Sequence, residues 1–151
     1  MNPIETILVA TDFSEQSRAA VDWAVDLAKP LGAKVVVVHA YALPIVGILD
    51  ASLMVDATTA TRMSTEAQAA LDAEVKRASG RGAGGGVAIE GSLREGDARE
   101  VLPQAATDTK AGLLVVGSHG RRGLQRALLG SVAENVARSS PVPVVVVHPK
   151  R

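Results

Sequence analysis

One stretch of the sequence decides the fold. Residues 113–136 read LLVVGSHGRRGLQRALLGSVAENV. The apolar run Leu113–Gly117 is typical of a strand that is covered on both faces. Ser131 and Glu134 form a capping box, which predicts that a helix begins at Gly130-Ser131. A strand that leads through a glycine-containing turn into a helix is one step of an alternating α/β chain.

The same alternation extends toward both ends of the chain. Five short apolar runs are predicted strands, and the third, the weakest, is predicted to lie at a sheet edge: Ile4–Ala10, Lys34–Ala40, Gly86–Glu90, Leu113–Gly117 and Val142–His148. Helical patterns separate them, from an N-cap at Ser14 to a stop at Gly32, from about Thr58 to Ser79, from Asp97 to about Thr109, and from Gly130-Ser131 to Ser139. This order predicts one α/β domain, an open parallel sheet with helices on both faces.

The composition excludes several classes of function. The 151 residues include 16 basic and 16 acidic side chains and no cysteine. The isoelectric point near 6.8 argues against a nucleic-acid binder, for which values above about 9 are usual. Without cysteine, thiol catalysis and disulfides are excluded, and no apolar run reaches the roughly 20 residues of a membrane span. We therefore expect a cytoplasmic protein without a nucleic-acid or membrane partner.

Three glycines and a serine around the fourth predicted strand could enclose an anion. Gly117 ends the strand, Gly120 follows in the turn, and Gly130-Ser131 opens the next helix, whose free N–H groups favour negative charge. Because ligands of open α/β sheets bind beyond the carboxyl ends of the strands, Thr11-Asp12 after the first strand should lie nearby. Ordinary turns, a plain N-cap at Ser131 and an Asx turn at Asp12 are the structural alternatives.

Two further segments are predicted to be loops. Gly80–Gly86 is glycine-rich, but it follows a helix and precedes a strand, which favours a linker over a phosphate loop. Tyr41–Ala57 carries many apolar residues, so we expect it to pack on the ligand pocket or on a partner subunit.

Three segments together resemble the universal stress protein family, and specifically its ATP-binding branch. The first is Ile7-Leu8-Val9-Ala10-Thr11-Asp12-Phe13-Ser14, which is similar to the family's first strand and its aspartate-containing turn. The pattern Gly-x2-Gly-x9-Gly-Ser/Thr matches Gly117, Gly120, Gly130 and Ser131 without a gap, and the tail Pro141–Val147 is similar to the family's last strand. The resemblance covers nearly the whole chain, with one departure: Gly112 stands where the family usually has an aspartate before its fourth strand.

The resemblance implies a Rossmann-like nucleotide-binding domain over residues 1–151, with five parallel strands in the order 3-2-1-4-5. It implies that Asp12, with Ala10 and Thr11, contacts the nucleoside of ATP and that Ala40 packs on the adenine. It also implies Mg²⁺ or Mn²⁺ with the phosphates, and a homodimer formed through the edge strand Val142–Val147. The ribose and phosphates would be held by Gly117, Gly120, Gly130, Ser131 and Val132.

Other polar residues near the glycines have a functional and a structural interpretation. Arg121 could neutralise phosphate charge or be a solvated arginine, and His119 could accept a proton but is better explained as a loop residue. His39 and His148 lack metal-ligand spacing, so we interpret them as structural or exposed.

Our leading hypothesis is an ATP-binding regulatory or sensor protein that acts as a dimer in a stress response. No catalytic constellation is evident, so at most weak ATPase activity is expected. A slow ATP hydrolase with His119 orienting water, and an interaction module with a vestigial nucleotide site, are the alternatives.

Overall fold

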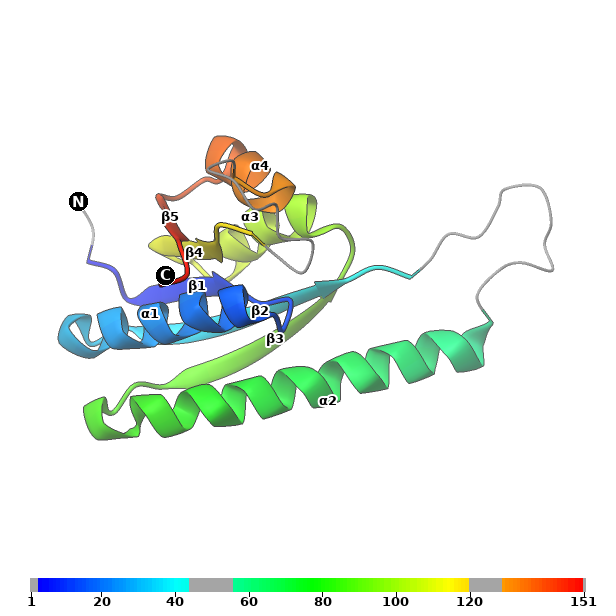
Figure 1. Cartoon of the computed structure of the whole chain (residues 1–151), viewed down its shortest axis with the longest axis horizontal. Coiled ribbons are helices and arrows are strands. Elements are labelled where there is room, and N and C mark those ends of the chain that lie inside the picture. The colour runs from blue at the N-terminus through cyan, green and yellow to red at the C-terminus, as the bar shows by residue number, and fades with distance from the viewer. Residues whose placement is uncertain (1–2, 44–55, 120–128, 151) are drawn as a thin grey trace.

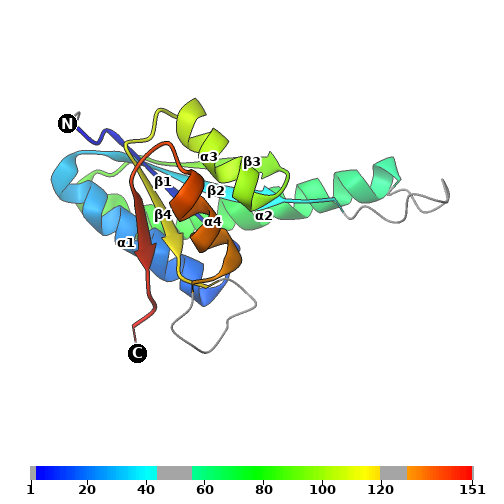
Figure 2. The same cartoon turned by 90° about the horizontal axis from the view of Figure 1, so that it is seen from above.

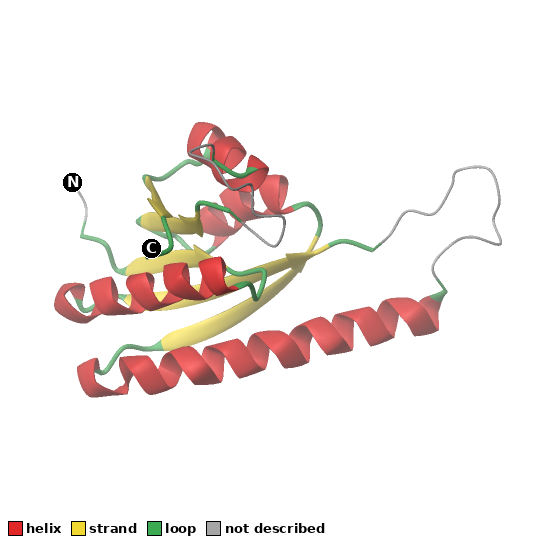
Figure 3. Ribbon diagram, in the orientation of Figure 1, coloured by secondary structure: helices red, strands yellow, loops and turns green. Residues whose placement is uncertain are grey.

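The computed structural model describes residues 3–43, 56–119 and 129–150. Strands and helices alternate along the chain (Figures 1 and 3). Their order is β1 Thr6–Ala10, α1 Glu15–Leu31, β2 Lys34–Tyr41, α2 Ala57–Gly82, the 3-10 turn η2 Ala83–Gly85, β3 Ile89–Glu95, α3 Ala98–Asp108, β4 Leu113–Gly117, α4 Ser131–Ser139 and β5 Val144–Val147. No helix in the described ranges is both long and apolar enough to cross a membrane.

All five strands form one parallel sheet of order β3-β2-β1-β4-β5, as predicted. Alternate residues of each strand face opposite sides, which explains why the central strands are apolar throughout. Ile7 and Val9 of β1 join α1 and α2 in one core, whereas Leu8 joins α3 and α4 in the other. Figure 1 shows α3 and α4 on one side of the sheet and α1 and α2 on the other, and Figure 2, seen from above, shows α3 and α4 in front of the sheet.

Local signals fix the start and end of α1. The Ser14 hydroxyl accepts a hydrogen bond from the Ser17 amide at 3.2 Å, and so caps the first turn. Gly32 ends the helix in a left-handed conformation with φ 64°. The predicted bounds of this helix are confirmed, and Pro30 is accommodated within its last turn.

The predicted end of the second helix and the predicted bounds of the third strand were wrong, whereas the helix begins within one residue of its predicted start. The helix α2 continues into the glycine tract as far as Gly82, where a Cβ atom would lie 3.3 Å from Ile89 and Val87. The glycine therefore permits close packing of α2 on the sheet. The edge strand β3 covers Ile89–Glu95 instead of Gly86–Glu90. Its residues are half-buried or exposed, so its sequence lacks the apolar run by which the central strands were found.

The ends of the sheet also differ slightly from the prediction. β5 begins at Val144 and not at Val142, since Pro143 has no N–H to give to a ladder. Gly112 precedes β4 and donates its N–H to the Thr6 carbonyl at 2.9 Å, at the amino end of the sheet. Most of the predicted Tyr41–Ala57 loop lies outside the described residues; Tyr41 itself ends β2 and Ala57 begins α2.

Candidate functional site

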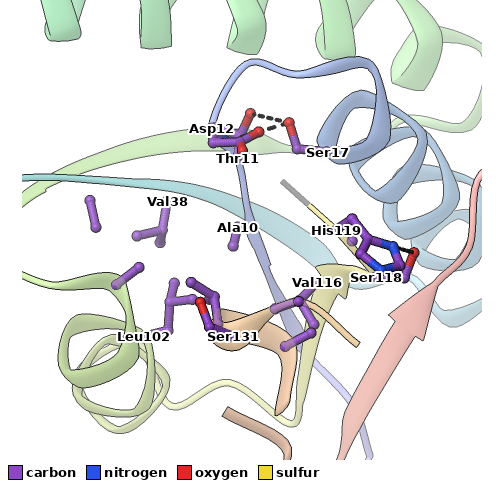
Figure 4. A pocket seen from close by; sticks show the side chains of 16 residues that line it. Ala10, Thr11, Asp12, Ser17, Val38, Leu102, Val116, Ser118, His119 and Ser131 are labelled. Atoms are coloured by element: carbon purple, nitrogen blue, oxygen red, sulfur yellow. Dashed lines mark hydrogen bonds between the residues drawn. The ribbon is translucent and has the colours of Figure 1, made fainter. Parts of the chain in front are cut away.

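A cavity of about 570 Å³ opens where β1, β2 and β4 end, on the face of the sheet that α3 and α4 cover. This size is in the range of small-molecule sites, and the carboxyl edge is where open α/β sheets bind ligands. Figure 4 shows side chains from the β1–α1 corner on one side and from α3 and the start of α4 on the other.

Every predicted site residue that the structure describes lines this cavity. They are Ala10, Thr11, Asp12, Ala40, Gly117, Gly130, Ser131 and Val132. The remaining two, Gly120 and Arg121, lie outside the described residues. Segments far apart in the sequence thus meet at one end of the sheet because parallel strands all end there.

Asp12 lies in a tight turn between β1 and α1. Its Oδ1 atom accepts hydrogen bonds from the Ser14 amide, at 3.0 Å, and from the Ser14 hydroxyl. The bond to the amide two residues ahead is an Asx turn, so the structural alternative for Asp12 holds. The same side chain also borders the cavity, so this role leaves room for ligand contact.

The hydroxyl groups of Thr11 and Ser17 stabilise this turn by hydrogen bonds. Thr11 is 5% exposed, and its hydroxyl lies 3.2 Å from the Ser17 hydroxyl. The Asp12 amide donates to the same Ser17 oxygen at 3.4 Å. Ser17 is a cavity residue that the sequence motifs did not indicate, because it lies within the first turn of α1 and not in the loop before it.

Among the described residues, no side chain caps the start of α4. Gly130 is the N-cap and makes no side-chain hydrogen bond to the first turn. The helix begins at Gly130-Ser131 as predicted, but the alternative of Ser131 as a plain N-cap is wrong: it is the first residue of the helix and it borders the cavity. Because the first N–H groups of a helix have no intrahelical acceptor, they can bind an anion in the cavity.

Glycine brings the end of β4 close to the start of α4. The Gly130 amide donates to the Ser118 carbonyl at 2.7 Å, and a Cβ atom on Gly130 would lie 3.1 Å from that oxygen. A Cβ atom on Gly117 would lie 3.3 Å from the Gln16 carbonyl. These short distances explain why glycine occupies both positions.

The rest of the wall is apolar. It is formed by Val38, Ala98, Leu102, Val116 and Ala133. Strand periodicity could have indicated Val38 and Val116, since they share a sheet face with Ala40 and Leu114, but the residues of α3 could not be found without the fold. Asp12 is the one charged side chain among the described lining residues.

His119 also lines the cavity, beyond its predicted role as a loop residue. Its Nδ1 lies 3.2 Å from the Ser118 hydroxyl. Its Nε2 is buried and has no hydrogen-bond partner within the described part of the chain. No three His, Cys, Asp or Glu side chains cluster as metal ligands in that part either.

The fold and the cavity define an open parallel α/β protein with a ligand site at the carboxyl edge of its sheet. Residues 3–148 match the model of the universal stress protein family. The chain belongs to that family.

Known relatives agree with this assignment. A universal stress protein of Methanocaldococcus jannaschii is 33% identical over 99% of this chain and 86% of its own. A universal stress protein solved in complex with cAMP is 31% identical over 97% of this chain and 98% of its own, with a TM-score of 0.72. UspA from Lactobacillus plantarum has a TM-score of 0.81 at 22% identity, over 97% of this chain and 99% of its own.

Proposed function

We propose that this protein binds an adenine nucleotide, ATP together with Mg²⁺ or Mn²⁺, and acts as a regulatory or sensor protein in a stress response. One observation carries the proposal: an apolar cavity ends at the N-terminus of α4, whose first turn no described side chain caps. The apolar end suits a base, and the free amides suit phosphates. The relative solved with cAMP supports the same class of ligand.

Each part of the nucleotide has a place in this proposal. Ala10, Thr11 and Asp12 contact the nucleoside, and Ala40 packs on the adenine. The glycine turns and the first turn of α4 hold the ribose and phosphates, with Arg121 adding positive charge. Phosphate oxygens hold the divalent ion, aided by the Ser131 hydroxyl, because the described cavity wall offers Asp12 as its one carboxylate.

We further propose that the protein is a cytoplasmic homodimer joined through the β5 edge. The chain has no cysteine, which suits a reducing compartment. The backbone edge of β5 is unpaired among the described strands, and its four valines are half-buried. Such an edge favours pairing with another strand.

Titration calorimetry with ATP and Mg²⁺ tests nucleotide binding. We expect saturable binding that weakens by tenfold or more, about 1.4 kcal/mol, in Gly130→Val and Ser131→Leu. A Cβ atom at Gly130 would press on the Ser118 carbonyl beside the cavity, and the Ser131 side chain borders the cavity directly. Gly80→Ala is the matched control, because a Cβ atom there meets nothing within 4 Å. Unchanged affinity in both test variants would contradict the proposal. Parallel titrations with AMP, cAMP and adenosine would show how much the phosphates contribute.

A further inference from the structure

The turn that presents Asp12 to the cavity contains an unfavourable backbone conformation. Phe13 has φ 65°, in the left-handed region that bulky side chains rarely adopt. Such a conformation persists when surrounding contacts determine it, and it is often found next to functional sites. Contacts on both faces of the sheet hold the Phe13 backbone in this conformation.

Two hydrogen bonds within the turn stabilise the Phe13 conformation. The Phe13 amide donates to the Thr11 hydroxyl at 3.1 Å, and the Ser14 amide donates to Asp12 Oδ1 at 3.0 Å. Both acceptors are side chains of residues that line the cavity. The left-handed turn and the orientation of Asp12 are therefore linked.

A further contact, with His39, stabilises the turn from the other face of the sheet. His39 of β2 alternates with Val38 and Ala40, which line the cavity, so its side chain lies on the opposite face. There its ring packs against Phe13, with a centroid distance of 4.4 Å and an interplanar angle of 42°. His39 thus contacts the turn without being a cavity residue.

His39 also bonds to the backbone of the turn. The Thr11 amide completes the β1–β2 ladder by donating to the Val38 carbonyl at 2.9 Å. The Thr11 carbonyl lies 2.8 Å from His39 Nδ1. Because a carbonyl only accepts, Nδ1 must carry the hydrogen. This bond holds the Thr11–Asp12 peptide, just after β1 ends and where the chain turns away.

We propose that His39 is a positioning residue: from the face opposite the cavity, it holds the turn Thr11–Ser14 in the conformation that directs Asp12 toward the ligand. The proposal rests on the proposed nucleotide site for its effect on affinity. Its structural half, that His39 fixes the turn, is independent of any ligand.

Three variants separate these claims. His39→Ala removes both the ring and the hydrogen bond. His39→Asn loses the ring, but its amide nitrogen can donate from nearly the position of Nδ1. His148→Ala is the control, since His148 is exposed beyond β5. In each variant, amide hydrogen exchange is measured at Phe13 and Ser14 and compared with the buried α1 residue Val21, and ATP affinity is measured by calorimetry with Mg²⁺.

We expect His39→Ala to accelerate exchange at Phe13 and Ser14 by about tenfold, the change that loss of one hydrogen bond would give. Exchange at Val21 should be unchanged, ATP should bind at least fivefold more weakly, and His39→Asn should recover part of both effects. His148→Ala should match the wild type.

Two results would overturn the proposal. The first is unchanged exchange at Phe13 and Ser14 in His39→Ala, whether or not nucleotide binds. The second is a loosened turn with unchanged ATP affinity. If the wild type bound no nucleotide at all, the proposed function would fail, and the exchange data would still decide whether His39 holds the turn.

Discussion

At the scale of single residues, serine and aspartate side chains cap the first turns of α1, α2 and α3. Asp97 caps α3: its Oδ1 accepts the Arg99 amide at 2.9 Å, and the Arg99 guanidinium bonds to both carboxylate oxygens. The side-chain hydrogen bonds of Arg99, followed by its backbone amide, lower the pKa of Asp97 to about 2 from its ordinary 3.8. Charge is therefore part of this cap.

The lowered pKa predicts a pH-dependent contribution to stability. A carboxyl whose folded pKa is depressed stabilises the fold above its unfolded pKa and loses that effect as pH falls toward the folded value. The window here runs from about pH 4 down to about pH 2. Asp97→Ala should cost about 1 kcal/mol of unfolding free energy at pH 7, the usual value for an N-cap at an exposed position. The difference from wild type should shrink at pH 3.

Urea unfolding at pH 7, 4 and 3 measures this difference. Asp97→Asn is the matched control, because an amide oxygen can still accept the Arg99 amide but carries no charge. Its deficit should be smaller than that of Asp97→Ala at pH 7. A deficit for Asp97→Ala that stays constant over this pH range would contradict the assigned role of the charge.

The sequence predicted the cavity residues that belong to motifs with a fixed spacing. It did not predict the residues that reach the cavity only through the packing of the fold. Gly117 ends a strand, Asp12 follows one and Gly130 precedes a helix, so the sequence could place them together before the fold was known. The N-cap alternative for Ser131 failed because a capping box cannot distinguish the N-cap from the first helical residue when glycine precedes it. His39 acts across the sheet through a backbone carbonyl, which leaves no sequence signal.

At the scale of elements, ion pairs attach α2 to α1. Glu74 of α2 has a side chain only 3% exposed, and Arg77 bonds to both of its carboxylate oxygens at 2.7 and 3.0 Å. Arg77 also reaches Asp22 of α1 at 2.8 Å. These hydrogen bonds, that of Glu74 first, raise the pKa of Arg77. The buried face of α2 therefore includes a carboxylate beside the apolar Leu71 and Ala78.

Removing Arg77 should destabilise the fold more than removing the whole ion pair. Arg77→Ala leaves the Glu74 carboxylate buried, with Arg18 at 3.7 Å as its remaining cation, and should cost about 3 kcal/mol of unfolding free energy. Glu74→Leu combined with Arg77→Met replaces the pair by apolar contacts and should recover most of the loss. Urea denaturation of the wild type and both variants tests this. A double variant as unstable as Arg77→Ala would refute it.

The sequence predicted the boundaries of elements whose residues are fully buried. It did not predict those of elements that are only partly buried. The central strands β1 and β4 are buried on both faces, so their apolar runs located them. Seven residues of the edge strand β3 pair with β2, and three of them, Glu90, Arg94 and Glu95, are charged. These polar side chains interrupt the apolar pattern and obscured the extent of the strand. The glycines that end α2 were taken for a loop because helix propensity disfavours them.

At the scale of the whole molecule, the two edges of the sheet differ in chemistry. Charged side chains along β3 discourage edge-to-edge pairing, whereas β5 consists of four valines. Both strands are edges in the order β3-β2-β1-β4-β5. This asymmetry supports the proposed dimer through β5. The hydrogen bonds between β4 and β5 then show which backbone groups of β5 remain for a partner strand.

The Leu114 amide donates to the Pro143 carbonyl at 3.0 Å, and the Ser118 amide donates to the Val147 carbonyl at 2.9 Å. Since successive peptide groups of a strand point to alternate sides, Val144 and Val146 direct their N–H and C=O groups away from β4. Val146→Pro removes one outward donor without breaking a bond to β4, a substitution that edge strands accept.

We therefore expect Val146→Pro to sediment as a monomer at concentrations where the wild type is a dimer. Val146→Thr, which keeps the N–H and a β-branched side chain, should remain dimeric. Because no residue of β5 lines the described cavity, the monomeric variant should still bind ATP, which shows that it is folded. A dimeric Val146→Pro, or a wild type that is monomeric at every concentration tested, would rule out pairing through this edge.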